Sequence, residues 1–164
     1  MARLFVAVWP PAPVLEQLEA LTRPVIPGVR YTRRDQWHVT LRFLGEVEVG
    51  DVAAALEEFH APAATAELGP AVRTLGRHVL CVPVSGLDEL ASAVVTATAD
   101  IGEPPGPRPF CGHVTLARLG RRAPHEIGGE RIAARFLVSE IHLVESLRSD
   151  GRVIYATRLT ISLE

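Results

Sequence analysis

One octapeptide occurs twice in this chain. Residues 38–45 read HVTLRFLG and residues 113–120 read HVTLARLG, so six of the eight positions are identical. The copies start 75 residues apart, which is close to half of the 164 residues. Such a repeat predicts one domain, residues 1–164, built from two intertwined lobes that a pseudo-two-fold axis relates. Each lobe contributes one H-x-T motif, at residues 38–41 and 113–116.

The side chains of each octapeptide divide between two faces if the segment is a β-strand. Residues two apart on a strand share a face, so His38 and Thr40 point to one side and the intervening apolar residues to the other. His113 and Thr115 have the same arrangement in the second copy. Packing explains the recurring valine, leucine and glycine, but it gives no reason to keep a polar pair on the opposite face twice. The repeat therefore predicts that two imidazoles and two hydroxyl groups meet where the lobes face each other.

Two facing histidines suit the cleavage of a phosphodiester. A base must activate water and an acid must protonate the leaving oxygen, and the two must flank the phosphorus because attack and departure are roughly in line. The reference pKa of histidine, about 6.5, allows one neutral and one protonated imidazole near neutral pH. Threonine hydroxyls can donate hydrogen bonds to the non-bridging oxygens. A 2',3'-cyclic phosphate is a favourable substrate, because its ring is strained and its leaving oxygen stays tethered. The pseudo-symmetry leaves open which histidine donates the proton.

A metal site is an alternative use of a histidine pair. A catalytic zinc ion normally has three protein ligands. The sequence offers no third histidine or carboxylate at a matching position of the two motifs. We therefore expect neither a metal nor another cofactor.

The rest of the chain predicts an α+β fold with mainly antiparallel sheets. Apolar, β-branched runs indicate strands, and apolar residues three and four apart behind a proline or a capping residue indicate helices. Helices are expected after the prolines at 10, 11 and 13, from Asp51, and from about Leu87 to Ile101. The expected strands are 3–9, 38–44, 65–75, 78–84, 113–119, 135–145 and 152–162. Hairpins and helices mix in this order, which disfavours a regular parallel βαβ sheet.

Charge and composition narrow the class of partner and the compartment. The net charge is −2, and all 17 basic residues are arginine. This argues against a protein that wraps long RNA by bulk electrostatic attraction, but it is compatible with an enzyme that grips one terminal phosphate. The two cysteines lack C-x-x-C spacing, no apolar run reaches the roughly 18 residues of a membrane span, and prolines interrupt the N-terminal apolar run. We expect a cytoplasmic protein without a membrane partner, and a monomer, because the pseudo-dimer already lies within one chain.

The two H-x-T-L motifs resemble those of the 2H phosphoesterase superfamily, and more closely those of its RNA 2',3'-cyclic phosphodiesterase family, the 2'-5' RNA ligase-like proteins. The segments LFVAVWP at 4–10 and IHLVESLRSDGRVIY at 141–155 are similar to further strands of that family. The resemblance implies a bilobal α+β fold, with helices outside and an active-site groove between the lobes. It also implies hydrolysis of a terminal 2',3'-cyclic phosphate to a 2'-phosphomonoester without a metal.

The resemblance further implies roles for individual residues. His38 corresponds to the proton donor and His113 to the proton acceptor. Thr40, Thr115 and Arg118 correspond to groups that bind the substrate phosphate. Simple alternation puts Arg118 on the core side of its strand, so a bulge or the end of the strand must redirect it.

Two other positions beside the motifs bear on the site. By alternation Arg42 shares the face of His38 and Thr40, and it is therefore a possible groove-lining residue. Family members often have proline directly before the second histidine, where this chain has Gly112. The change leaves the two histidines and two threonines intact.

Two alternatives to hydrolysis stay open on the sequence. The same residues could run the reverse reaction, in which a 2'-5' RNA linkage forms as a side activity, because microscopic reversibility uses the same acid and base. The chain could instead be a non-catalytic module that binds RNA ends. The expected partner is an RNA 3' end or a small nucleotide that bears a cyclic phosphate. A tRNA fragment, an oligonucleotide, a cyclic mononucleotide and an ADP-ribose cyclic phosphate all present similar phosphates.

Overall fold

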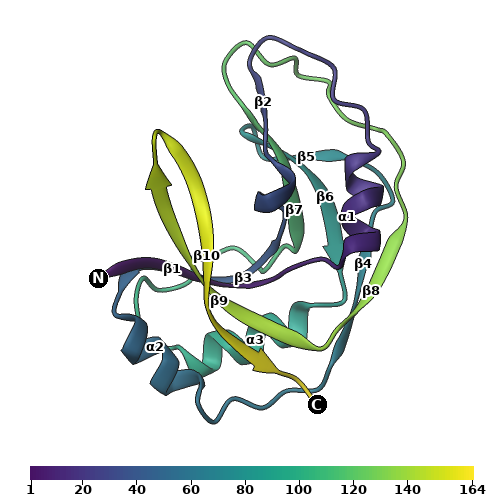
Figure 1. Ribbon diagram of the computed structural model, residues 1–164. Helices are drawn as coiled ribbons and strands as arrows, with labels where there is room; N and C mark the ends of the chain where they lie inside the picture. The colour runs from purple at the N-terminus through teal and green to yellow at the C-terminus, as the bar shows by residue number, and fades with distance from the viewer.

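The computed structural model describes residues 1–164 and confirms the predicted α+β class. Ten strands form one curved antiparallel sheet, and three α-helices pack against it (Figure 1). The elements are β1 (Ala2–Val8), α1 (Ala12–Glu19), β2 (Val29–Tyr31), the short 3-10 helix η1 (Arg34–Gln36), β3 (Val39–Val47), α2 (Val49–Leu56), β4 (Ala64–Leu68), β5 (Arg73–Leu75), β6 (Val79–Ser85), α3 (Asp88–Ala97), β7 (His113–Leu119), β8 (Ala134–Val138), β9 (Glu140–Ser149) and β10 (Arg152–Ser162). None of the helices is long and apolar enough to cross a membrane.

The two octapeptides form the two central strands of the sheet. The strand order is β10-β9-β1-β3-β7-β6-β4-β8, with β2 paired to β7 and β5 paired to β6. Along the main path, without β2 and β5, four strands therefore lie on each side of the boundary between β3 and β7. The two central strands pair at a single position, where Val39 lies opposite Val114. Both valines are fully buried, so the apolar sides of the motifs meet in the core.

Two of the three helices, α1 and α3, pack against the half of the sheet opposite to the strand that precedes them. Helix α1 follows β1 but contacts β8, which lies in the other half of the sheet. Helix α3 follows β6 but contacts β3, again in the opposite half. A single core cluster of 32 buried residues spans both halves. Each half of the sheet is thus covered by chain from the other half.

Two of the expected strands are each divided in the structure. The expected strand at 65–75 ends as β4 at Leu68, because Pro70 has no N–H to donate to a ladder and Gly69 adopts a positive φ of 123°. The remainder, β5, forms an antiparallel hairpin with β6 around Gly76. The expected strand at 135–145 divides at Ser139 into β8, which is the last strand at one end of the order, and β9, which is second from the other end.

Smaller differences concern short elements and helix ends. The strand β2 and the helix η1 are not expected from the sequence, since three residues are too few to show a hydrophobic period. Helix α2 ends at Leu56 and α3 ends at Ala97, earlier than the apolar spacing suggests. Phe59 and Ile101 still pack in or against the core, from the segments that follow each helix.

Candidate active site

Both motifs open onto one groove. His38 and Thr40 from β3 and its entry, and His113 and Thr115 from β7, line a cavity of about 610 Å³. The four polar side chains converge because β3 and β7 are neighbours in the sheet and the apolar side chains of both motifs are buried in the core, on the other face. The other lining residues are Arg3, Phe5, Arg30, Tyr31, Thr32, Arg33, Gln36, Phe43, Arg118, Ser146, Arg148, Gly151, Arg152, Val153 and Tyr155.

The two imidazoles are held in the same tautomer by the same local contact. His38 Nδ1 lies 2.7 Å from the carbonyl oxygen of Gln36, and His113 Nδ1 lies 2.8 Å from the carbonyl oxygen of Cys111. A carbonyl can only accept, so Nδ1 carries the hydrogen in both rings. This leaves Nε2 of each ring to exchange a proton. Nε2 of His38 lies 2.9 Å from the Thr40 hydroxyl oxygen.

A β-bulge at the same position of each octapeptide reverses the faces of the residues that follow. In β3 the pairing with β1 skips Leu41, and in β7 the pairing with β6 skips Leu116. A bulge inserts one residue and shifts the later side chains to the opposite face. The exposed side chain of Arg118 therefore lines the groove, as does Phe43 at the equivalent position of the first copy.

The same bulge removes Arg42 from the groove, which corrects the expectation from simple alternation. Arg42 is only 3% exposed. Its guanidinium donates to the Thr98 hydroxyl at 3.3 Å and to the carbonyl oxygens of Ile101 at 3.0 Å and Glu103 at 2.8 Å. These groups belong to the C-terminal end of α3 and the loop after it. Arg42 thus satisfies backbone carbonyls inside the protein and has no access to a ligand in the groove.

The groove is strongly basic although the whole chain is slightly acidic. Six arginines line it, and no aspartate or glutamate does. A concave surface of one sign favours ligands of the opposite sign. Apart from Arg118, these arginines lie outside the motifs, and the sequence alone does not predict that they line the groove. They come from β1, β2, the start of η1 and the β9–β10 hairpin, and only the sheet brings them together (Arg3, Arg30, Arg33, Arg148 and Arg152).

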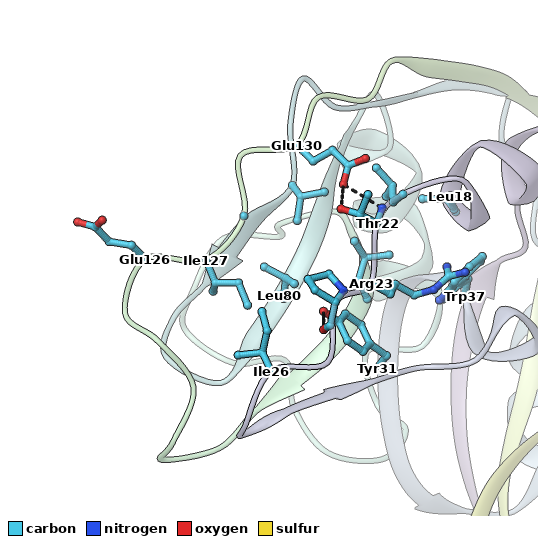
Figure 2. Close-up of a pocket in the computed structure, with 15 residues that line it drawn as sticks. Leu18, Thr22, Arg23, Ile26, Tyr31, Trp37, Leu80, Glu126, Ile127 and Glu130 are labelled. Carbon is cyan, nitrogen blue, oxygen red and sulfur yellow. Dashed lines mark hydrogen bonds between the residues drawn. The ribbon is translucent and has the colours of Figure 1, made fainter.

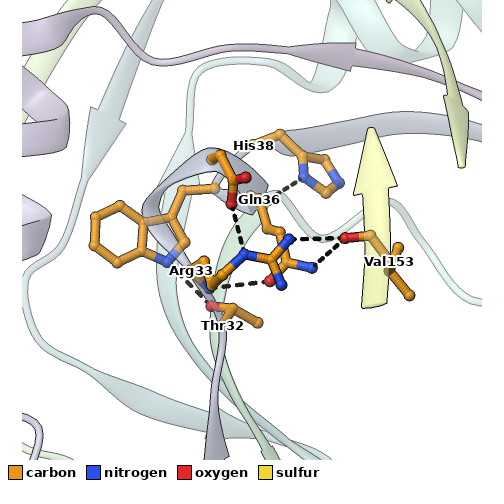
Figure 3. Close-up of polar contacts among 7 residues, drawn as sticks. Thr32, Arg33, Gln36, His38 and Val153 are labelled. Carbon is orange, nitrogen blue, oxygen red and sulfur yellow. Dashed lines mark hydrogen bonds and ion pairs between the residues drawn. The ribbon is translucent and has the colours of Figure 1, made fainter. Parts of the chain in front are cut away.

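A network of hydrogen bonds ties the first motif to the β9–β10 hairpin (Figure 3). Arg33 Nη2 and Gln36 Nε2 both donate to the carbonyl oxygen of Val153, at 2.9 and 3.2 Å. The Gln36 side-chain oxygen accepts from the Arg33 backbone N–H at 2.9 Å. Gln36 also supplies the carbonyl that orients His38, so the hairpin and the first histidine are fixed through one residue.

The surroundings of His38 lower its pKa. Burial lowers the pKa of His38 to about 4; the hydrogen bond to the Gln36 carbonyl opposes this shift, and the nearby charges of His113 and Arg118 add to it. The imidazole of His38 is therefore uncharged near neutral pH in the free protein. Burial also raises the pKa of the Tyr155 hydroxyl, whose ring packs against that of His38, and this hydroxyl stays neutral as well.

This lowered pKa gives an expected pH dependence of stability. A histidine with a lower pKa in the folded chain contributes stability that is complete above the unfolded pKa of about 6.5 and is lost as the pH falls toward about 4. We expect the free energy of unfolding to fall by about 3 kcal/mol across this window through His38. Urea unfolding at a series of pH values measures the loss, and His38→Gln should remove this component. If the free energy of unfolding depended on pH in the same way in the wild type and in His38→Gln, His38 would not be the source of the loss.

A second cavity, of about 250 Å³, lies on the core side of the motif strands (Figure 2). Leu80, Leu116 and Trp37 line it together with residues that follow α1. At its edge the Thr22 hydroxyl donates to a carboxylate oxygen of Glu130 at 2.6 Å. None of the motif histidines or threonines lines it, so the polar face of the repeat is confined to the basic groove.

Known proteins share parts of this sequence and its fold. A family model described as LigT like phosphoesterase matches residues 8–69. A search of curated proteins found no match. Among solved structures, a phosphoesterase is 29% identical over 99% of this chain and 98% of its own, with a TM-score of 0.83. A protein of Thermus thermophilus is 26% identical over 98% of this chain and 97% of its own, with a TM-score of 0.82.

E. coli LigT is a third similar structure. In its complex with 3'-AMP it is 28% identical over 99% of this chain and 98% of its own, with a TM-score of 0.79. Crystal structures of E. coli LigT also exist with ATP, NADP+ and phosphate. In sequence over residues 8–69, and in fold over nearly its whole length, the chain is similar to LigT-like phosphoesterases.

Proposed function

We propose that the protein hydrolyses the 2',3'-cyclic phosphodiester of an RNA end or a nucleotide to a 2'-phosphomonoester, by metal-independent acid–base catalysis. One observation carries the proposal: two histidines in the same tautomer, each with Nε2 left for proton exchange, share one arginine-lined groove. The likeness to LigT-like phosphoesterases supports phosphoester chemistry. The complexes of E. coli LigT with 3'-AMP, ATP and NADP+ support a nucleotide as the ligand.

The proposed step uses one proton transfer at each histidine. His113 Nε2 takes a proton from water, and the water oxygen forms a bond to phosphorus. The bond from phosphorus to the 3' oxygen breaks, and His38 Nε2 protonates that oxygen as it leaves. The products are a 2'-phosphate and a 3'-hydroxyl, with His113 protonated and His38 neutral, and exchange with solvent resets the pair.

The remaining groups bind the phosphate in this scheme. The hydroxyls of Thr40 and Thr115 donate to its non-bridging oxygens, where negative charge accumulates. Arg118 adds a charge-assisted hydrogen bond from the side of β7. His38 must gain a proton to act as donor, and the negative charge of a bound phosphate favours its charged form. Both histidines come from one chain, so the scheme needs no second subunit.

A panel of substrates tests the proposed function. Cyclic mononucleotides, short RNAs with a 2',3'-cyclic end and an ADP-ribose cyclic phosphate are incubated with the protein, and the products are separated. We expect a 2'-phosphate from at least one class, and we expect turnover to persist in a chelator because the proposed step uses only side chains. Exclusive formation of a 3'-phosphate would contradict the proposal that the bond from phosphorus to the 3' oxygen breaks. If no substrate were turned over, the proposed hydrolysis would be wrong and a non-catalytic binding role would remain.

Joining of RNA ends is the second candidate activity at the same groove. The acid and base that open a cyclic phosphate with water can open it with a 5'-hydroxyl instead, which forms a 2'-5' linkage. Water is in large excess, so we propose hydrolysis as the main reaction and ligation as a side activity. Incubation of a cyclic-phosphate RNA with a 5'-hydroxyl acceptor separates the two by the length of the product.

A further inference from the structure

The two motif histidines have equivalent positions in the repeat but different surroundings. Three aromatic rings pack against His38: the centroid of its ring lies 4.9 Å from that of Phe5, 5.2 Å from that of Tyr155 and 5.6 Å from that of Trp9. None of the close ring pairs in the structure includes His113. The pseudo-symmetry of the sequence is therefore broken at the imidazoles themselves.

The three rings form an aromatic cage that does not depend on His38. Phe5 belongs to a small apolar cluster separate from the main core, against which Trp9 and Tyr155 pack. The Phe5 and Tyr155 rings make an edge-to-face contact at 5.2 Å and 79°. Trp9 Nε1 donates to the Thr157 hydroxyl at 3.3 Å. The cage is thus held in place by β1 with the residue after it and by β10, which flank β9 on its two sides, and His38 fits against the cage from the entry of β3.

Nothing negative faces the imidazole inside the free groove. His113 and Arg118 face it from β7 and disfavour a positive charge on it. Tyr155 faces it from β10 with a neutral hydroxyl, and the charges nearest that hydroxyl are Arg118, Arg3 and Arg33. The Gln36 carbonyl is the one group that favours a charged ring. Burial by three rings, without a carboxylate, makes a charged His38 costly.

We infer that Phe5, Trp9 and Tyr155 are positioning residues, which keep His38 uncharged in the free protein so that it takes up its proton only when a phosphate anion occupies the groove. The inference rests on the proposed role of His38 as proton donor. A bound phosphate supplies the missing negative charge, and the proton comes from the solvent or from the anion itself.

Nuclear magnetic resonance titration of the His38 ring protons tests the inference, with inorganic phosphate as the probe. Without phosphate, His38 in the wild-type protein should keep its neutral chemical shift down to a pH of about 5, since its pKa is lowered to about 4. Saturating phosphate should raise the midpoint by at least about one pH unit. A midpoint near 6.5 without phosphate, or no change on adding it, would overturn the inference.

Matched variants separate the cage from the neighbouring charges. Tyr155→Ala and Trp9→Ala each remove a partly buried ring and should raise the midpoint without phosphate toward about 6.5. Tyr155→Phe keeps the ring and should titrate as the wild type does. His113→Gln removes the neighbouring ionisable group but leaves the three rings in place, and it should raise the midpoint less than Tyr155→Ala does. If Tyr155→Phe matched Tyr155→Ala, or His113→Gln had the larger effect, the aromatic rings would not be the cause.

The titration and the enzymatic assay can refute the inference and the proposed function separately. The titration requires no turnover, so an ordinary midpoint for His38 in a protein that hydrolyses cyclic phosphates refutes the cage alone. A low midpoint that phosphate raises, in a protein that turns over no cyclic phosphate, refutes the proposed function alone.

Discussion

Replacing either motif histidine by alanine is expected to lower kcat on a 2',3'-cyclic phosphate by about 10³-fold, with the fold intact. General acid–base catalysis by one positioned side chain contributes about 10² to 10⁴ in rate, and the mechanism we propose assigns one such transfer to each of His38 and His113. The double variant is not expected to lose the product of the two factors, because both residues act in one transition state. Steady-state kinetics on the three variants measures these losses.

The control for this experiment is a histidine outside the groove. His125 is exposed in the loop after β7 and does not line the groove, so His125→Ala should keep full activity. Circular dichroism and thermal unfolding establish that each variant is folded. Full activity in His38→Ala or His113→Ala would rule out the proposed chemistry, whatever the remaining groove residues do.

Strand periodicity alone is sufficient to assign the faces of the four motif groups. His38 and Thr40 precede the bulge at Leu41, so alternation of side chains assigns their face correctly. The second copy behaves in the same way up to Leu116. Core packing on one side of each strand and polar groups on the other are both visible in the octapeptide itself. The convergence of the two polar faces follows from that pattern once the strands are neighbours.

Beyond the bulges, alternation of side chains assigns the wrong face, because a bulge depends on how a strand pairs with its neighbour and not on the strand's own sequence. Neither octapeptide has a glycine or proline at its fourth residue, where a local signal would be sought. The extra residue is accommodated against β1 in one half and against β6 in the other. The sequence indicates a bulge for Arg118 only because the family likeness requires that side chain to reach the phosphate. The likeness implies no role for Arg42, so nothing in the sequence corrects simple alternation there, and the prediction that Arg42 lines the groove is wrong.

The aromatic cage and the basic walls are beyond sequence reasoning for a related cause. Phe5 and Tyr155 are 150 positions apart in the chain, and they meet only because β1 and β10 both flank β9. Their effect on His38 distinguishes two histidines that the repeat makes equivalent. The sixth residue of each octapeptide differs as well: Arg118 on one side, and on the other Phe43, whose ring lies 4.8 Å from the Arg3 guanidinium. The halves share a backbone plan but present different chemistry to a ligand.

The two arginines that follow the motif threonines are expected to respond in opposite ways to truncation. Arg42→Ala removes the donor to the buried Thr98 hydroxyl and to the partly buried carbonyl oxygens of Ile101 and Glu103. Each unsatisfied buried group costs about 1 to 3 kcal/mol, so we expect the free energy of unfolding to fall by about 3 kcal/mol. The folded fraction should keep a normal KM, because this side chain does not line the groove.

Arg118→Ala should show the reverse pattern. The residue is exposed, so its loss should change the free energy of unfolding by less than about 0.5 kcal/mol. A hydrogen bond from a charged donor to the phosphate is worth about 1.5 to 3 kcal/mol, which corresponds to a loss of about 10- to 100-fold in kcat/KM. Arg121→Ala, in the exposed loop after β7, is the matched control and should change neither quantity. Urea unfolding and Michaelis–Menten kinetics on the three variants decide the matter, because a KM effect in Arg42→Ala or none in Arg118→Ala would mean that the bulges do not orient these side chains in solution.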